Sequence, residues 1–542
     1  MASFSNILKE LLNVKNSRVE KVLTGTEIFK QYGVEQVRKT LNIEVSPYKR
    51  KQCLCPICMK KCPIYDHKRP EMSRWRAPDF NGVPVYLCYR PSRIMCKEHG
   101  VHTEYIPWAD GKSRFTADFN NEVAWLVSRM SKSDIALYLG INWRTVGNCV
   151  DAACKRIEPD TSVRWNGLKR ICVDETSYKG GHNYITVVYD MDRNQVIWIA
   201  KDHGQEIFGK FCEALTEEQR ESIEIVAGDG AKWIDACVSK YFPNATRCID
   251  FFHVVQWVND ALDKIRRATH NKACKEYRDR QKELEELEKE IAAQRKKYTD
   301  ELKSLPKRGR PSKRKLELLE LLAALEPIYE TEEKGVGRPA SIKLSKEHAD
   351  EVNALRETAV EIKNSRYALG KNPQNLTENQ AQKLELIKNS YPDLYKGYQH
   401  KEALRLILHM KDPDFALQEL ENWIADVEKD GDENMIALAE KIGRHKDNII
   451  NSIKHHANSA KSESTNTSIK VLIRMGRGFR SMENLFSLIY LKCSDLIIPL
   501  NNRPQPSAEV LKEMRENANQ RRKARLSMQL ANAPGILPTQ TA

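Results

Sequence analysis

Short apolar runs between positions 165 and 268 alternate with helical patterns and polar turns. The first three runs are rich in β-branched and aromatic residues, which predicts a three-stranded antiparallel meander. The later runs alternate with stretches of three-four apolar spacing, which is typical of amphipathic helices. The expected strands are 171–173, 184–189, 196–199, a run that ends at Asp229, and a run through Cys248 and Ile249; the expected helices are 206–215 and 232–241. This order predicts a mixed sheet flanked by helices.

Helical patterns dominate the chain on both sides of this region. The first 45 residues are expected to form one or two short amphipathic helices. Beyond Arg267, Leu284, Leu287 and Ile291 follow helical spacing among many charged residues. That pattern predicts a long solvated helix or an antiparallel coiled coil. The final segment is rich in Asn, Pro, Gln and Arg and is expected to be partly disordered.

A helix-turn-helix pattern lies between residues 119 and 157. Ser131 or Ser133 can cap a first helix, Gly140 suits the tight turn, and the second helix begins at Asn142 or Trp143. The first turn of that second helix would present Trp143, Arg144 and Thr145 to DNA.

Six of the fourteen cysteines lie between Cys53 and Cys96. This crowding favours reduced, metal-binding thiols over disulfides. Two pairs have the two-residue gap that lets both ligands approach one tetrahedral zinc ion from a tight turn. The pairs are Cys55 with Cys58 and Cys96 with His99, and Cys53, Cys62 and Cys88 remain alternative ligands.

Length, charge and composition indicate the number of domains and the kind of partner. The 542 residues exceed the size of one core, so several domains are expected. The net charge of +14, with 30% charged residues, favours contact with nucleic acid. Because the sequence contains no apolar run of bilayer length, we expect a cytoplasmic, nucleoid-associated protein without membrane contact.

Acidic residues follow two of the predicted strands. Asp174 ends the first strand, Asp229 ends the fourth between Gly228 and Gly230, and Glu463 lies in a predicted helix far downstream. Three carboxylates from separate elements suit two divalent ions that act on a phosphodiester. Magnesium fits such ligands, and manganese could replace it.

Four motifs in this order resemble those of bacterial insertion-sequence DDE transposases of the ISL-three type. They are Val173-Asp174-Glu175 with Gly181-His182-Asn183-Tyr184; Gly228-Asp229-Gly230; Phe242-Pro243-Asn244-Ala245 with Ile249-Asp250-Phe251-Phe252-His253; and Glu463-Ser464-Thr465-Asn466 with Ile469-Lys470 and Gly478-Phe479. The resemblance covers most of residues 50–495. It implies an RNase H-like catalytic domain that is interrupted by a helical insertion, with the acidic triad at Asp174, Asp229 and Glu463.

The expected fold class is therefore multidomain α+β, with a zinc ribbon-like module, a helix-turn-helix and a mixed α/β domain interrupted by a long all-α insertion. The expected segments are 1–45 (helical), 46–110 (zinc-binding), 111–160 (helix-turn-helix), 165–268 (catalytic, first part), 269–458 (helical insertion), 459–498 (catalytic, last part) and 499–542 (tail).

Two of the implied roles keep alternatives. The family often has Gly after the last acid, whereas Ser464 follows Glu463, so Glu440 and Glu421 remain alternatives. His253 is a candidate to contact the scissile phosphate or stabilise charge in the transition state. Alternatively, Asp250 caps a helix and His253 packs in its first turn.

Basic residues suggest further DNA contacts. Arg474, Arg477 and Arg480 follow Glu463 at a spacing that predicts one helix face, and Lys470 is a further candidate. Arg308-Gly309-Arg310-Pro311 has the form of an AT-hook, whose arginines enter the minor groove of A·T-rich DNA.

The sequence therefore predicts a transposase that binds the terminal repeats of its element, cleaves DNA and joins it to a target. The expected partners are double-stranded DNA, from element ends and target, and further copies of the chain, because holding two ends requires at least a dimer. Two alternatives remain: a DNA-binding regulator that no longer cuts, and a metal-dependent nuclease without strand transfer.

Overall fold

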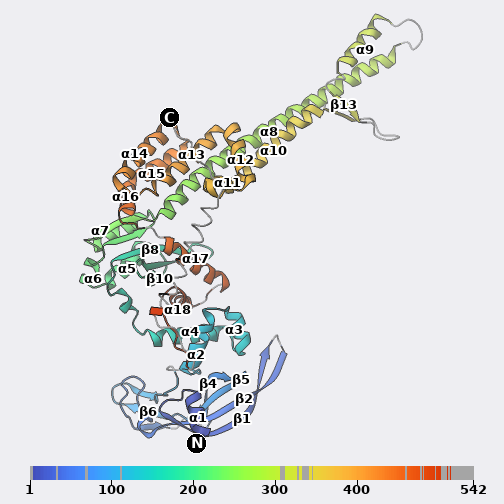
Figure 1. The fold of residues 1–542 in the computed structure, drawn as a ribbon. Helices are drawn as coiled ribbons and strands as arrows, with labels where there is room; N and C mark the ends of the chain where they lie inside the picture. The colour runs from blue at the N-terminus through green and yellow to red at the C-terminus, as the bar shows by residue number, and fades with distance from the viewer. Residues whose placement is uncertain are drawn as a thin grey trace. The chain divides into compact units, whose positions relative to one another are not determined.

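Two compact units make up the chain in the computed structural model (Figure 1). The first contains Met1–Thr246 and Ser459–Ala542, and the second contains Arg247–Asn458. The structure describes residues 4–31, 34–66, 71–109, 113–305, 312–325, 329–332, 341–344, 346–457, 460–476, 479, 481–494, 496–501, 509, 510, 513 and 520. Sheets and helices occur together, which agrees with the expected α+β class.

A four-stranded sheet follows the first helix, α1 (Phe4–Leu11). Its strands, in the order β1-β2-β5-β4, are β1 (Ser17–Gln31), β2 (Val34–Pro47), β5 (Val83–Tyr89) and β4 (Ser73–Phe80). Ile43, Val85 and Leu87 are almost completely buried in its core beside Trp75 and Trp108. A short 3-10 helix, η1 (Lys49–Lys51), follows β2.

The prediction of helices for residues 1–45 is therefore wrong after Leu11. Residues 17–31 and 34–47 form two antiparallel strands in which Val22 is opposite Ile43 and Ile28 is opposite Val37. Val22 packs against the core that contains Ile43, and cross-strand pairs of β-branched residues stabilise a sheet. The amphipathic pattern reflected a two-residue period, not a helical one.

A second, three-stranded sheet contains Cys96 at the end of one strand, and His99 lies in the turn that follows. The sheet has the order β3-β6-β7, with β3 (Ile64–Asp66), β6 (Arg93–Cys96) and β7 (Gly100–Thr103).

Three helices follow, and they have the predicted helix-turn-helix geometry. They are α2 (Ala117–Val127), α3 (Lys132–Leu139) and α4 (Trp143–Ile157). The Ser131 side chain caps α3, and the Asn142 side chain caps α4. Gly140 ends α3 with a φ of 62°, a left-handed conformation that glycine adopts without strain.

The central sheet has the strand order β10-β9-β8-β11-β12. Its strands are β8 (Arg170–Lys179), β9 (Asn183–Asp190), β10 (Gln195–Lys201), β11 (Ile225–Gly228) and β12 (Thr246–Ile249). The pairs β8–β9 and β9–β10 are antiparallel, whereas β8 and β11 are parallel. All five predicted strands are present, but β8 continues to Lys179, so Asp174 lies in the middle of this strand and not at its end as predicted.

Helices cover both faces of this sheet. One face packs against α5 (Gln205–Ala214) and α7 (Lys232–Tyr241) through a core that includes Val173, Phe208 and Phe211. On the other side, α17 (Ala460–Met475) packs on β8, and α18 (Met482–Cys493) packs on β10. The remaining elements are η2 (Thr161–Trp165) and α6 (Glu217–Glu221).

The second unit is mainly helical. Its helices are α8 (Phe251–Ser304), α9 (Lys313–Leu325), α10 (Lys346–Asn364), α11 (Arg366–Gly370), η4 (Pro373–Asn375), α12 (Glu378–Ser390), α13 (Pro392–Ile407), α14 (Pro413–Asp430), α15 (Glu433–Arg444) and α16 (Lys446–Lys454). The start of α8 lies in a core with α13 to α16, which includes Leu262, Leu404 and Ile442.

Two details of the predicted insertion differ. The insertion is not entirely helical, because β13 (Tyr329–Glu332) and β14 (Ser341–Leu344) form an antiparallel pair. The expected boundary at 268/269 falls inside α8, which continues for 54 residues from Phe251. The sequence pattern changes where α8 leaves its apolar core and becomes solvated, not where the helix begins.

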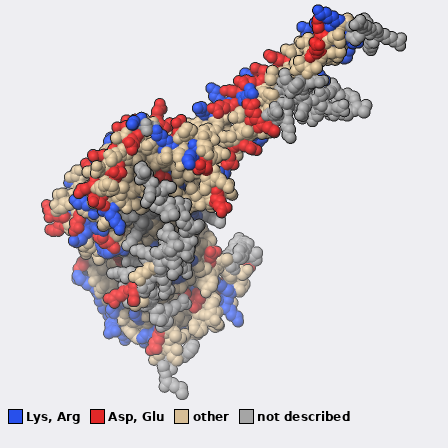
Figure 2. Space-filling model, turned by 45° about the horizontal axis from the view of Figure 1, so that its top comes forward, with Lys and Arg blue, Asp and Glu red and all other residues tan. Residues whose placement is uncertain are grey.

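The far part of α8, with α9 and α10, forms an arm with mixed surface charge (Figure 2). Arg280 of α8 pairs with Glu351 of α10 at 3.0 Å, and Arg314 of α9 pairs with Glu301 at 2.8 Å. Leu284 and Ile291 are buried along the arm. The arm therefore has the character of the predicted solvated helical hairpin. Among the described residues, no helix combines the length and apolarity required to cross a bilayer.

We expect Phe211→Ala to destabilise the central sheet domain by about 3–5 kcal/mol, because truncating a buried Phe leaves a cavity. Phe211 is completely buried and packs against Trp165, Trp198 and Phe208. Calorimetric unfolding measures the loss. Phe80→Ala is the control, since Phe80 is 53% exposed, and it should change stability by less than about 0.5 kcal/mol. Equal losses in both variants would contradict the assigned core.

Candidate functional site

Asp174 and Asp229 occupy neighbouring positions in the interior of the central sheet, where β11 ends beside the middle of β8; this place is called the acidic edge below. Parallel pairing of β8 and β11 places Val173 opposite Gly228, so the next residues of the two strands are the aspartates. Neighbouring strands lie about 4.7–4.9 Å apart. Two carboxylates 55 positions apart in the sequence are thus brought side by side by strand register.

The Asp174 carboxylate has hydrogen bonds on both oxygens. Its Oδ1 accepts from the backbone N–H of Glu175 at 2.7 Å. Its Oδ2 accepts from the side-chain amide of Asn466, which lies on α17. The amide oxygen of Asn466 in turn accepts from the hydroxyl of Tyr189 on β9. Asn466 and Tyr189 are both buried.

Asp229 lies in the turn between β11 and α7. Its Oδ1 accepts from the backbone N–H of Ala231 at 3.0 Å, which stabilises the entry to the helix. This turn role is compatible with metal binding, because a carboxylate has more acceptor positions than one hydrogen bond uses.

Glu175 adds a third described carboxyl group to this edge. Burial raises its pKa, and the negative charges of Asp229 and Asp174 act in the same direction, whereas His203 opposes the shift. Glu175 Oε2 lies 3.6 Å from His203 Nδ1, and Oε1 accepts from the backbone N–H of Gly204 at 3.3 Å. The charges of both aspartates thus act on Glu175, so negative charge is concentrated here.

Glu463 lies in α17, three residues before Asn466, but its side chain is outside the described residues. Its two alternatives belong to the second unit. Glu421 on α14 pairs with Lys446 at 2.6 Å, and Glu440 is an exposed residue of α15. Neither belongs to the unit that contains both aspartates.

Asp250 caps α8 by accepting from the backbone N–H of Phe252 at 2.9 Å, so the structural alternative for Asp250 is confirmed. His253 lies in the first turn of the same helix, with its ring 5.6 Å from that of Phe252. These residues belong to the second unit, and the catalytic role of His253 stays a prediction.

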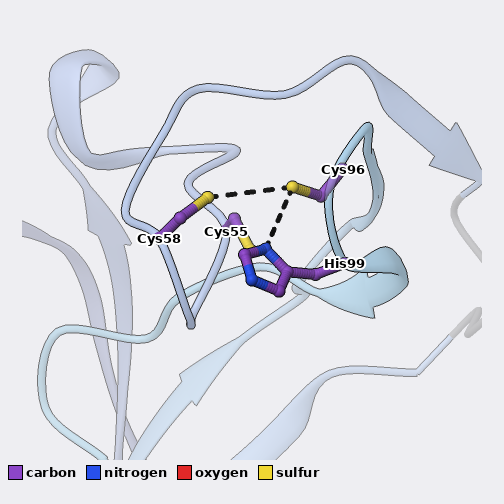
Figure 3. A group of neighbouring side chains, drawn as sticks. All are labelled: Cys55, Cys58, Cys96 and His99. Atoms are coloured by element: carbon purple, nitrogen blue, oxygen red, sulfur yellow. Dashed lines mark hydrogen bonds between the residues drawn. The ribbon is translucent and has the colours of Figure 1, made fainter.

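Cys55, Cys58, Cys96 and His99 meet at one point (Figure 3). Their ligand atoms all lie within 4.8 Å of one another. Cys58 Sγ is 3.7 Å from Cys96 Sγ, and His99 Nδ1 is 3.5 Å from Cys96 Sγ and 3.8 Å from Cys55 Sγ. Tetrahedral zinc, with bonds of about 2.0–2.3 Å, separates its ligands by about 3.5–3.8 Å. The donor set and spacing therefore fit a zinc ion.

Two tight turns build this cluster. In the first, Cys55 and Met59 are joined by a backbone hydrogen bond of 2.9 Å. The second connects β6 to β7, where Cys96 pairs with Gly100. A backbone N–H from Glu98, assisted by the His99 ring, lowers the pKa of Cys96 to about 6. The thiolate that binds metal is therefore favoured at neutral pH.

The alternative cysteine ligands lie outside the set of four. Cys53 and Cys62 pack around it, whereas Cys88 lies on β5 of the other sheet and its Sγ approaches the carbonyl of Tyr86 at 3.9 Å.

The proposed DNA-reading turn is accessible. Trp143 is 43% exposed, Arg144 is exposed and Thr145 is half-buried at the start of α4. The later turns of α4 dock on α18, since Ser487 Oγ donates to Asp151 at 2.9 Å. One end of α4 is thus open to a ligand while the other is anchored to the central domain.

Two residues of the predicted basic face lie on α17. Lys470 and Arg474 are exposed on this helix, which ends at Met475. Gly476 follows, and its N–H bonds to the carbonyl of Leu472 at 3.0 Å. Arg477 and Arg480, like the AT-hook-like Arg308 and Arg310, lie outside the described residues.

Sequence reasoning missed Asn466, Tyr189 and His203 as members of this edge. The useful signal was that Asn466 follows Glu463 by three residues, which places both on one side of a helix. The hydrogen-bond and charge partners of Asn466, Tyr189 and His203 depend on tertiary packing, which the periodicity of the sequence does not encode.

Comparison with known proteins adds family membership. Residues 171–334 and 338–489 match a family model described as a transposase. Residues 104–154 match the helix-turn-helix domain of transposase family ISL3. The transposase for insertion sequence element IS1557 from two strains of Mycobacterium tuberculosis is 33% identical over 440 residues, which cover 81% of this chain and 85% of the relative.

The transposase for insertion sequence element IS1001 of Bordetella parapertussis is 23% identical over 466 residues, which cover 84% of this chain and 93% of the relative. The family model spans more than half of the chain, including the central sheet and α17. The chain therefore belongs to the ISL3 family of insertion-sequence transposases and is a DNA-binding, DNA-processing enzyme.

Proposed function

We propose that this transposase cleaves DNA at the ends of its element and joins the freed ends to target DNA. The observation that carries the proposal is the register that sets Asp174 beside Asp229, under helix α17. The strand order β10-β9-β8-β11-β12, with helices on both faces, supports an RNase H-like catalytic domain.

The proposed metal ligands are Asp174, Asp229 and Glu463. Residues three apart in a helix share a face, so the contact of Asn466 with Asp174 supports an approach of Glu463 to the same edge. Oxygen ligands and the need for open positions fit Mg²⁺, and Mn²⁺ could replace it. A pair of bound ions would activate the attacking oxygen and stabilise the leaving oxygen.

The reaction then needs two displacements at phosphorus. A water oxygen bonds to the phosphate at the element end, the bond to the 3′-oxygen breaks, and that oxygen takes a proton from solvent. The resulting 3′-hydroxyl attacks a target phosphate and displaces a target 3′-oxygen, with no covalent protein intermediate. Asp174 and Asp229 would hold the metal ions in the same place during both displacements. His253 remains a candidate contact to the phosphate.

DNA recognition is assigned to accessible residues of the first unit. Trp143, Arg144 and Thr145 would read the terminal repeat from the major groove, and Lys470 and Arg474 would contact backbone phosphates. The AT-hook-like loop with Arg308 and Arg310 remains a further proposed contact, as does Arg477. Because two element ends must be held together, the active complex contains at least two copies of the chain.

Zinc at Cys55, Cys58, Cys96 and His99 would have a structural role. All four ligand positions come from the protein, and a closed set of four is the pattern of structural sites. The module around it would then be a zinc ribbon-like element that supports the adjacent helix-turn-helix.

The alternatives make different predictions for one assay. Purified protein is incubated with element-end DNA, target DNA and Mg²⁺. Binding without nicking supports the regulator, nicking without joined product supports the nuclease, and joined product supports the transposase.

Asp174→Ala and Asp229→Ala should each abolish cleavage in this assay while retaining DNA binding, because the metal site loses a ligand. Gel analysis of cleaved ends and a binding titration measure the two properties. Asp192→Ala is the matched control, since Asp192 is an exposed acid in the turn after β9. Cleavage by either acidic-edge variant would refute the assignment.

Cys58→Ser and Cys96→Ser should each lose about one equivalent of zinc, because a four-ligand site loses a thiolate. They should also unfold the module at lower temperature. Elemental analysis and calorimetry measure both effects. Cys88→Ala should retain its zinc, since Cys88 lies outside the cluster. Full zinc content in the two serine variants would exclude this ligand set.

Arg144→Ala should weaken binding to element-end DNA by about 1–3 kcal/mol if it contacts a base edge, with a smaller effect on unrelated DNA. Competition binding at fixed salt measures both affinities. Arg129→Ala removes the same charge from an exposed position before α3 and is the control. Equal losses on both DNAs would contradict base reading by Arg144.

A further inference from the structure

Asn466 connects three elements at the acidic edge: it bonds to Asp174 on β8 and to Tyr189 on β9 from its own position on α17. Tyr189 is 3% exposed and Asn466 is 8% exposed, so water cannot easily replace these contacts. The tyrosine faces Cys172 across the β8–β9 pair, two residues before Asp174. The two hydrogen bonds therefore connect Tyr189 in the sheet core to the Asp174 carboxylate.

The chemistry of the three side chains sets the direction of these hydrogen bonds. An asparagine amide has one acceptor side and one donor side, and an ionised carboxylate only accepts. The Tyr189 hydroxyl donates to the amide oxygen, which leaves the NH₂ group facing Asp174. The opposite amide orientation would place an oxygen against the carboxylate and leave the hydroxyl without its acceptor.

Tyr189 is suited to remain the donor. Burial raises its pKa well above the ordinary value, and the negative charge of Asp174 adds to the shift. The hydroxyl therefore keeps its proton throughout the neutral range. The amide orientation does not depend on pH there.

We propose that Asn466 and Tyr189 are positioning residues that orient the Asp174 carboxylate for metal binding. The inference rests on the proposed function, in which Asp174 is a metal ligand. Hydrogen bonds from neighbouring groups to a ligating carboxylate fix its orientation and strengthen metal binding. The same contact docks α17 on β8, so it also fixes the helix that carries Glu463.

Asn466→Ala should raise the Mg²⁺ concentration for half-maximal cleavage by about 10–100-fold, with activity restored at high Mg²⁺. Tyr189→Phe keeps the ring but removes the donor, and it should produce a smaller shift in the same direction. In the double variant the tyrosine change should add little, because its effect passes through Asn466. Cleavage rates over a Mg²⁺ titration measure all three.

Thr467→Ala, on the exposed side of the same helix, is the matched control and should leave the Mg²⁺ dependence unchanged. A purely structural role would reduce the active fraction in Asn466→Ala without shifting the half-maximal concentration, and that result would overturn the proposal. Should Asn466→Ala fail to fold, Tyr189→Phe decides alone, and a wild-type Mg²⁺ dependence in it would also overturn the proposal.

Asp174→Ala in the same titration tests the metal-ligand role of Asp174 separately from the positioning role of Asn466 and Tyr189. An inactive Asp174→Ala beside an Asn466→Ala with wild-type Mg²⁺ dependence would overturn only the positioning role. Cleavage by Asp174→Ala would overturn the metal-ligand assignment, and the positioning role with it.

Discussion

The parallel pairing of β8 with β11 is the constraint on which the site depends. It sets Asp174 beside Asp229, with Glu175 close enough to be affected by both charges. Like charges at this separation repel, and such clusters are stabilised by donors or cations. The protein supplies backbone N–H groups at Glu175 and Ala231 together with the Asn466 amide. These neutral donors offset part of the repulsion, and the divalent ions proposed at this site would offset more of it.

Distant segments must meet for this edge to be completed. Asn466 lies 292 positions after Asp174, beyond the whole second unit. The helix that follows, α18, packs on both β10 and α4. Helix α18 therefore connects the second helix of the helix-turn-helix to the sheet that carries the aspartates. The proposed recognition and cleavage sites both belong to the first unit.

The sequence was sufficient where local rules determine the structure. Apolar runs located all five central strands, and Ser131, Gly140 and Asn142 identified the helix-turn-helix because caps and left-handed turns are local. It failed for the β1–β2 hairpin, whose stability depends on cross-strand pairs. The hydrogen bonds of Asn466 with Tyr189 and Asp174 were not predictable, because no periodic pattern specifies a side-chain partner from another element. The family resemblance was confirmed.

The unbroken length of α8 determines how far along a DNA duplex the second unit could reach. A straight helix of 54 residues extends about 80 Å at 1.5 Å per residue. One turn of B-DNA is about 34–36 Å long. A duplex that followed the whole of α8 would therefore pass through about two helical turns. Groups at the two ends of α8 would then meet separate stretches of DNA, about two helical turns apart.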